Sequence, residues 1–247
     1  MDIIISGSTG RMGRILAETI AGRPEAYRVA ASYAPGADVS VAHTYRNLDD
    51  ITGQADVIID FSSHLATAAL CGFARRRKLP LVVCTTGQSE EEKTAIRELS
   101  RELPVFLSGN MSLGIATLVD LVRSAVRLFP EADVEIVEKH HNQKLDVPSG
   151  TALMLAHAVQ AVRPDSFLDI GRPKSGKRDP REIGIHSLRM GNEVGTHEVY
   201  INTGSECLIL SHQAESRAVF AEGALKAASF LVGREPGLYT MKELLEA

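Results

Sequence analysis

Short apolar runs alternate with helical stretches through the first half of the chain, and this alternation limits the fold more than any other feature. Expected strands lie at 3–6, 28–33, 57–62, 81–85 and 105–107, and expected helices at 11–21, 64–77 and 89–103. Strands joined through helices need right-handed crossovers, so the pattern predicts a parallel sheet covered on both faces. The strands are almost entirely apolar, as buried parallel strands are.

The second half of the chain follows a different pattern. We expect helices at 113–129, 149–162 and 215–231, a strand at 133–140, a loop at 164–180 and successive antiparallel strands at 183–190, 196–202 and 206–211. Strands that follow one another without helices indicate a second domain with an open sheet, inserted before a helix that returns to the first domain. The predicted domains are 1–111 with 215–247, and 112–214.

Composition excludes several classes of protein. Of 247 residues, 27 are basic and 31 acidic, and the net charge of −4 argues against a general nucleic-acid binder. No apolar run approaches the roughly 18 residues of a membrane span, and the first residues lack the features of a secretory signal. Three cysteines without a CxxC pair suit a reducing compartment. We therefore expect a cytoplasmic protein that binds neither nucleic acid nor membranes.

A glycine-rich turn stands between the first strand and the first helix. It reads Gly7-Ser8-Thr9-Gly10-Arg11-Met12-Gly13, where the glycines would allow a tight turn, close approach to a pyrophosphate and close packing of helix on strand. The helix start adds N–H groups and partial positive charge. A chance glycine-rich turn is the alternative, but the position after an apolar strand favours dinucleotide binding.

The end of the second strand bears on the choice of cofactor. An NAD site usually carries an acid there, whereas this chain has Ala34, and Asp38 is the first acid beyond it. NADPH is therefore at least tolerated. Ser32 and Arg11 are candidates to contact its 2′-phosphate, with an Arg11 that is only solvated as the alternative.

The densest polar cluster is EKHHNQKLDVPSGT at 138–151. A solvated loop would explain its charges but not its concentration of hydrogen-bond donors. A metal site is disfavoured, because adjacent histidines on a strand point to opposite faces and no acid or cysteine has ligand spacing. A titratable histidine, a fixed cation and a Ser-Gly-Thr helix start together favour acid–base catalysis on an anionic substrate.

This segment carries a family resemblance. EKHHNQKLDVPSGTA at 138–152 resembles the signature E-x-H-H-x-x-K-x-D-x-P-S-G-T-A of the 4-hydroxy-tetrahydrodipicolinate (dihydrodipicolinate) reductase family. Further matches are DFS at 60–62, TTG at 85–87, NMSLG at 110–114, RMG at 189–191, GTH at 195–197 and SR at 216–217. The resemblance runs from end to end of the chain.

The resemblance implies an α/β fold in which a Rossmann-type domain from both chain ends receives an inserted α+β domain with an open mixed sheet. The inserted domain would bind substrate and form a homotetramer. The implied activity is NAD(P)H-dependent reduction of 4-hydroxy-tetrahydrodipicolinate, a small dicarboxylate, to tetrahydrodipicolinate in diaminopimelate and lysine biosynthesis.

The resemblance also implies residue roles. His140 matches the proton donor, Lys144 the catalytic lysine, and His141, Gly150 and Thr151 the positions that hold substrate carboxylates. The expected cofactor contacts are Gly7, Ser8, Thr9, Gly10, Arg11, Met12, Ser32, Phe61, Ser62, Cys84, Thr85, Thr86, Gly109, Asn110, Met111 and Arg217. No metal is expected.

The chain departs from the family at two positions. Cys84 stands where many members have glycine, which would bring a thiol near the nicotinamide, and Ala34 replaces the acid after the second strand. The loss of that acid removes both a ribose ligand and a charge that repels phosphate, so we expect use of NADPH and NADH with a modest preference for NADPH.

Other interpretations stay open on the residues alone. A dinucleotide-binding sensor would have little reason to gather His140, Lys144 and a Ser-Gly-Thr helix start, and a dehydrogenase of an amino-acid semialdehyde is a second alternative. The basic segment 172–181 suggests a solvated surface, with tetramer contacts or steering of a dianion as alternatives.

Overall fold

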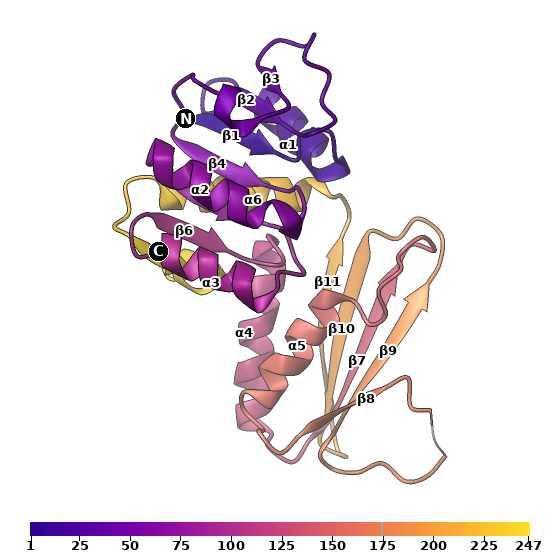
Figure 1. Cartoon of the computed structure of the whole chain (residues 1–247). Helices are drawn as coiled ribbons and strands as arrows, with labels where there is room; N and C mark the ends of the chain where they lie inside the picture. Colours follow the sequence, from indigo (N-terminus) through magenta and orange to yellow (C-terminus); the bar gives the residue numbers. More distant parts are fainter. Residues whose placement is uncertain (174) are drawn as a thin grey trace. The chain divides into compact units, whose positions relative to one another are not determined.

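The computed structural model describes residues 1–173 and 175–247 (Figure 1). The chain divides into two compact units, a first unit of Met1–Ser112 with Arg217–Ala247 and a second unit of Leu113–Ser216. The roles expected for the two parts, dinucleotide binding for one and substrate binding with oligomerisation for the other, stay predictions.

The first unit contains a seven-stranded sheet in the order β12-β6-β5-β4-β1-β2-β3. Its strands are β1 (Asp2–Ser6), β2 (Arg28–Tyr33), β3 (Thr44–Tyr45), β4 (Val57–Asp60), β5 (Leu81–Val83), β6 (Pro104–Leu107) and β12 (Gly237–Tyr239). Every pair is parallel. The apolar runs of β1 and β4 are fully buried, which confirms the parallel sheet predicted from the sequence.

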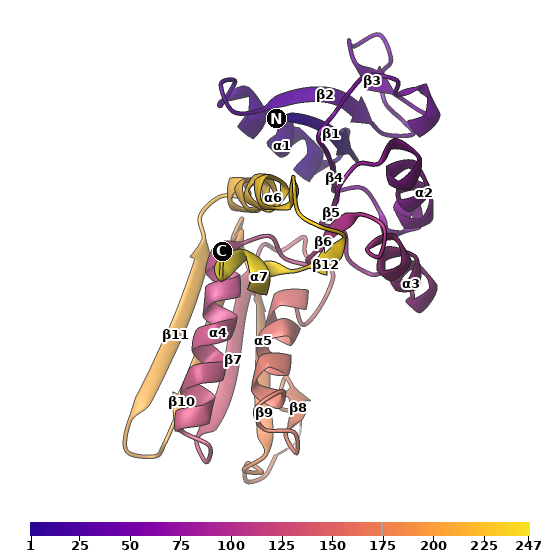
Figure 2. The same ribbon diagram turned by 90° about the vertical axis from the view of Figure 1, so that its left-hand side faces the viewer.

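Helices cover both faces of this sheet, as Figure 2 shows. Helices α1 (Arg11–Ala21) and α6 (Ala218–Leu231) pack together on one face, and α2 (Thr67–Arg77) and α3 (Glu90–Leu99) on the other. Short helices at Leu48–Asp50, His64–Ala66 and Met241–Leu245 complete the unit. Gly223 lets α6 approach closely, because a Cβ there would lie 1.7 Å from the carbonyl oxygen of Met111.

The strand order fixes where a ligand site can form. Because the strands are parallel, the loops that follow β1, β4, β5 and β6 lie at the same edge of the sheet. Strand β1 has β2 on one side and β4 on the other, so the chain changes direction across the sheet beside β1. Open α/β sheets bind their ligands at such a switch point.

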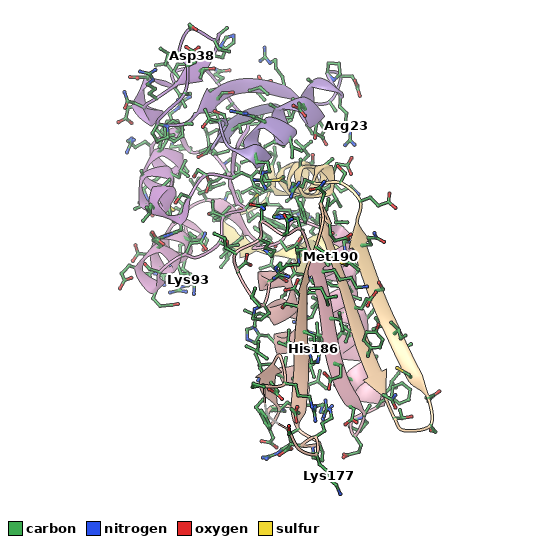
Figure 3. All side chains as sticks on the ribbon, turned by 90° about the vertical axis from the view of Figure 1, so that its right-hand side faces the viewer. Arg23, Asp38, Lys93, Lys177, His186 and Met190 are labelled. Carbon is green, nitrogen blue, oxygen red and sulfur yellow. The ribbon has the colours of Figure 1, made fainter. Side chains whose placement is uncertain are left out.

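The second unit contains a five-stranded mixed sheet in the order β11-β10-β7-β9-β8. Its strands are β7 (Asp133–His140), β8 (Phe167–Ile170), β9 (Glu182–Arg189), β10 (Gly195–Asn202) and β11 (Cys207–Ala214). Helices α4 (Leu113–Leu128) and α5 (Gly150–Gln160) pack on one face and enclose an apolar core with inward residues such as Val134, Ile136 and Ile185. The opposite face, toward the viewer in Figure 3, carries the labelled His186 on β9.

One expected pairing in this sheet is wrong. The strands at 183–190, 196–202 and 206–211 were expected to be antiparallel neighbours, but β9 pairs in parallel with β7 and β8. Helix α5 carries the chain back to the end of the sheet at which β7 begins, and this return permits parallel pairing. Strands β10 and β11 do form the expected antiparallel hairpin.

The basic segment 172–181 is largely paired within the second unit; its residue 174 lies outside the described residues. Arg172 pairs with Glu182 at 3.1 Å, and Arg181 with Asp179 at 3.0 Å. Arg178 contacts Glu135 and donates to the Val134 carbonyl oxygen at 2.9 Å. These contacts favour a structural role for the segment. In the described chain, none of the helices combines the length and apolar character needed to cross a membrane.

Candidate active site

The turn after β1 has the shape that its glycines predict. Gly7 has a φ of +81°, in the region where glycine is favoured, and the amide of Gly10 donates to the carbonyl oxygen of Gly7 at 3.0 Å. Gly10 is the N-terminal capping residue of α1, and as a glycine it has no side chain to accept a hydrogen bond from the first turn. The first N–H groups of α1 are therefore not covered by a capping side chain, which suits binding of phosphate groups.

Two glycines of this turn fill places where no side chain fits. A Cβ on Gly7 would lie 2.6 Å from Cα of Ser62, and a Cβ on Gly13 would lie 2.2 Å from the carbonyl oxygen of Gly7. The first contact brings the loop after β1 against the loop after β4. The second packs α1 tightly on its own strand, as the dinucleotide-binding motif requires.

A cavity of about 360 Å³ lies beside this turn in the loops after β4 and β5. It is lined by Phe61, Ser62, Ser63, His64, Cys84, Thr85 and Thr86. Five of these are expected cofactor contacts. Sequence reasoning missed Ser63 and His64, although they directly follow the DFS motif at the carboxyl edge of the sheet. Glu92 of α3 lies 3.0 Å from Nδ1 of His64 and holds the imidazole at the rim of this cavity.

Asp60 ties the two loops of the cavity together. It is 1% exposed, its Oδ1 accepts from the amide of Ser62 at 3.0 Å, and its Oδ2 accepts from the hydroxyl of Thr85 at 3.3 Å. Burial raises the pKa of Asp60 despite these hydrogen bonds. Burial also raises the pKa of the Cys84 thiol well above its usual value, so Cys84 stays protonated and unreactive.

The remaining expected cofactor contacts are less concentrated. Gly109 lies beside the cavity, since a Cβ there would lie 3.2 Å from Cγ2 of Thr86, and Asn110 and Met111 follow it in the chain. Ser32 lies within β2, where its amide donates to the carbonyl oxygen of His43 at 2.8 Å. Arg217 precedes the first residue of α6.

The residues after β2 are those from which the sequence predicts the choice of cofactor. Ala34 is 3% exposed. The carboxylate of Asp38, labelled in Figure 3, accepts hydrogen bonds from the amide and hydroxyl of Ser40 at 3.0 and 2.8 Å. Arg46 donates to the carbonyl oxygen of Ala37 at 2.8 Å, which places a cation after β3 that sequence reasoning missed.

In the second unit, β7 ends at the expected proton donor. Side chains two residues apart share a face of a strand, so Glu138 and His140 both point into the unit. Glu138 is fully buried, His140 is 8% exposed, and Nδ1 of His140 lies 2.5 Å from Oε2 of Glu138. The strand alternation thus pairs a buried carboxylate with the imidazole.

Arg189 of β9 completes this pair. It lies opposite His140 in the parallel register and donates to both oxygens of Glu138, at 2.8 Å from Nη1 and 2.7 Å from Nη2. Burial alone would raise the pKa of Glu138, but the hydrogen bonds from His140 and Arg189 outweigh it and hold the pKa far below its usual value. Glu138 is therefore a carboxylate. The sequence contains both residues in its motifs, but their contact is not visible there.

The start of α5 adjoins this cluster. Ser149 caps the helix by accepting from the amide of Ala152 at 3.1 Å, so Gly150 and Thr151 form its first turn as expected. The Ser149 hydroxyl also lies 3.1 Å from Nε2 of His197 on β10. Burial, with a smaller contribution from the neighbouring charge at His140, lowers the pKa of His197 to about 3. His197 is therefore a neutral part of the site, with no role predicted for it.

Lys144 and His141 lie in the turn after β7. Nζ of Lys144 is 2.8 Å from Oδ1 of Asp146, and the Lys144 side chain is 21% exposed. The amide of His141 donates to the carbonyl oxygen of Glu193 at 2.8 Å. Among the described residues no group of three or more histidines, cysteines and acids is arranged to hold a metal ion.

Comparison with known proteins covers the whole chain. Residues 1–111 match the family model described as "Dihydrodipicolinate reductase, N-terminus", and residues 114–245 match "Dihydrodipicolinate reductase, C-terminus". The chain is 46% identical to the 4-hydroxy-tetrahydrodipicolinate reductase of Caldanaerobacter subterraneus subsp. tengcongensis, over 99% of this chain and 98% of that protein. It is 39% identical to the protein of the same name from Clostridium novyi, over 99% and 98% of the two chains.

Solved structures share the fold. Dipicolinate-bound dihydrodipicolinate reductase from Paenisporosarcina sp. TG-14 superposes with a TM-score of 0.81 at 23% identity, over 97% of each chain. A probable dehydrogenase from Thermotoga maritima gives a TM-score of 0.63 at 11% identity, over 99% of this chain and 92% of that one. The resemblance drawn from the 138–152 signature is confirmed, and the chain belongs to the dihydrodipicolinate reductase family.

Proposed function

We propose that this chain reduces 4-hydroxy-tetrahydrodipicolinate to tetrahydrodipicolinate with a nicotinamide dinucleotide, in the biosynthesis of diaminopimelate and lysine. The observation that carries the proposal is the buried Glu138–His140 pair beside the start of α5, which joins a proton donor to a site for anions. Membership of the family supports the same reaction.

The first unit fits the cofactor. Three features support a dinucleotide-binding site here. They are the close backbone packing at Gly7 and Gly13, the start of α1, and the cavity in the loops after β4 and β5. When bound, the dinucleotide supplies a hydride. The chain's part is to hold the phosphates at the first turn of α1, with Asp60 fixing the loops around the cavity.

The second unit supplies the proton and binds the dicarboxylate. His140 would protonate the substrate carbon on which electron density accumulates after reduction. The N–H groups at Gly150 and Thr151 would hold a carboxylate at the helix start, and His141 would contact the substrate's carboxylates as well. Lys144 would hold the dianion and stabilise negative charge that develops during reduction.

The decisive experiment follows the absorbance of NADPH or NADH with the condensation product of pyruvate and aspartate semialdehyde. We expect turnover with both cofactors. Binding of cofactor without turnover would indicate a sensor, and turnover of the open-chain aldehyde alone would indicate a semialdehyde dehydrogenase. Either result would contradict the proposed function.

We expect NADPH to have the lower KM, by about 2- to 10-fold, because the buried Ala34 offers neither a ligand for the 2′-hydroxyl nor a charge that repels a 2′-phosphate. Asp38 is already engaged by Ser40. Arg11, exposed at the first position of α1, is the proposed phosphate contact. Arg11→Ala should raise the KM for NADPH about 3- to 10-fold and leave that for NADH nearly unchanged.

Arg14→Ala is the matched control, since Arg14 is also exposed on α1 but lies one turn farther from its start. If both variants raised the KM for both cofactors equally, Arg11 would contribute only positive charge near the start of α1 and would make no specific contact with the 2′-phosphate. A wild-type preference for NADH of about tenfold or more would contradict the expected order of the cofactors.

We further propose that the protein is a cytoplasmic homotetramer assembled through the second unit. The sheet face opposite α4 and α5 supports this, because Leu188 is 40% exposed and Ile209 is 52% exposed. Arg189, next to Leu188, and Leu210, next to Ile209, point toward the helices. Because neighbouring side chains of a strand point to opposite faces, Leu188 and Ile209 face away from the helices. Light scattering on the protein as it elutes from a size-exclusion column should give four times the mass of one chain. The mass of a single chain would contradict assembly.

A further inference from the structure

We propose that Glu138 is a positioning residue that fixes the tautomer of His140, with hydrogen on Nδ1, so that the proton delivered to the substrate leaves from Nε2. The inference rests on the proposed function in one respect, the assignment of His140 as the proton donor. It adds a role for the carboxylate behind that donor.

The first support is the arrangement around the carboxylate. Oε2 of Glu138 lies 2.5 Å from Nδ1 of His140 and accepts from Arg189 at 2.8 Å. Oε1 accepts from Arg189 at 2.7 Å and from the amide of Ser149 at 3.1 Å. Each oxygen thus has at least two partners, and the bidentate arginine prevents the carboxylate from turning.

The second support is the chemistry of an ionised carboxylate, which accepts hydrogen bonds and cannot donate them. His140 must therefore carry a hydrogen on Nδ1 in both its neutral and its charged form. When the imidazolium gives up the proton on Nε2 to the substrate carbon, it becomes the neutral Nδ1–H tautomer. No proton passes to Glu138, and the Nδ1–H···Oε2 hydrogen bond persists through the step.

The third support is the space beside Nε2. A Cβ on Gly195 would lie 3.0 Å from Nε2 of His140, a contact tighter than most that real Cβ atoms make, so the imidazole would have to shift. Glycine at this position of β10 therefore keeps Nε2 approachable. The His197 ring, 5.1 Å away between centroids and inclined by 74°, packs against the same imidazole and restricts its rotation.

Glu138 also connects the proton donor to the start of α5. Its Oε1 accepts from the amide of Ser149, the capping residue of that helix. One buried carboxylate thus fixes the proton donor and the helix start that would bind a substrate carboxylate. Their separation is set by the fold before substrate arrives, as a site for proton transfer requires.

Glu138→Gln tests the proposal because the NH₂ group of glutamine must take the place of either Oε1 or Oε2 of the carboxylate. At the Oε1 position, the new NH₂ would face two donors that cannot reverse, Arg189 and the amide of Ser149. At the Oε2 position it faces Arg189 and His140, and His140 can switch to accept at Nδ1. The variant should therefore place the hydrogen of neutral His140 on Nε2, the reverse of the wild type.

The readouts are the ¹⁵N spectrum of histidine-labelled protein in alkaline buffer and steady-state kinetics. We expect a protonated Nδ1 for His140 in the wild type and a protonated Nε2 in Glu138→Gln, with His140→Gln identifying the signals. The kcat of Glu138→Gln should fall about 10- to 100-fold, part of the roughly 10²–10⁴-fold that a general acid contributes. The KM for NADPH should change less than about threefold.

Glu135→Gln is the matched control. Glu135 lies on the same strand but on its other face, where it also contacts a histidine and an arginine, His186 at 2.9 Å and Arg178 at 3.1 Å. A kcat near the wild-type value is expected for this variant. An equal loss in both variants would assign the effect of Glu138 to stability alone.

Two results would overturn the proposal. One is a wild-type spectrum in which neutral His140 carries its hydrogen on Nε2, a measurement that needs no variant and therefore no assumption about folding. The other is a kcat of Glu138→Gln within about threefold of wild type. Because the spectrum requires no turnover, failure of the proposed function would appear separately, as a wild-type protein that does not reduce the substrate.

Discussion

Replacing His140 with glutamine is expected to lower kcat by about 10²–10⁴-fold, the usual contribution of a general acid. Glutamine keeps a polar group near Oε2 of Glu138 but carries no proton that can be transferred to carbon. His140 lies in the second unit, whereas the glycine turn and the cavity proposed for the cofactor lie in the first. The dissociation constant of NADPH, measured by fluorescence titration, should therefore be unchanged.

His186→Gln provides the control for this variant. His186 also pairs with a glutamate of β7, since its Nε2 lies 2.9 Å from Oε2 of Glu135, but it lies on the face of the sheet away from α4 and α5 (Figure 3). The kcat of His186→Gln should stay near the wild-type value. A fall of less than about threefold in His140→Gln would show that another group donates the proton.

The sequence predicted elements best where periodicity was strong. The helix at 11–21 and the strands at 28–33 and 133–140 have the predicted bounds. Strand β3 was missed because it has only two residues, too few to show an alternation of apolar and polar side chains. Strand β8 was missed because it lies in a segment rich in proline and glycine. The parallel pairing of β9 depends on contacts with β7, about fifty positions earlier, so no local pattern could reveal it.

The candidate site divides in the same way. Residues of contiguous motifs, such as His140 and the glycine turn, could be found because their neighbours in sequence are also their neighbours in space. Glu138 and Arg189 are 51 positions apart, and Ser149 and His197 are 48 apart, so their contacts appear only when the sheet is assembled. The buried charge of Glu138 was the detectable signal, since an acid at an inward strand position requires a partner.

Replacing Lys144 with alanine is expected to lower kcat/KM for the substrate by about 10- to 100-fold, the equivalent of one hydrogen bond to a charged group. In the free protein Nζ of Lys144 lies 2.8 Å from Asp146, so binding of a dianion would exchange one carboxylate partner for another. The cation would serve both the bound substrate and the charge that develops during reduction. KM should therefore rise and kcat should fall together, while the KM for NADPH stays nearly constant.

Lys139→Ala separates this effect from a general loss of positive charge. Lys139 also belongs to the signature segment and also pairs with an acid, Glu198 at 2.9 Å, but its side chain lies on the opposite face of β7 from His140. Its kinetic constants should remain close to those of the wild type. If Lys144→Ala kept a near-wild-type KM and kcat, Lys144 would be no more than the surface partner of Asp146, and the substrate dianion would have to be held by His141 and the start of α5 alone.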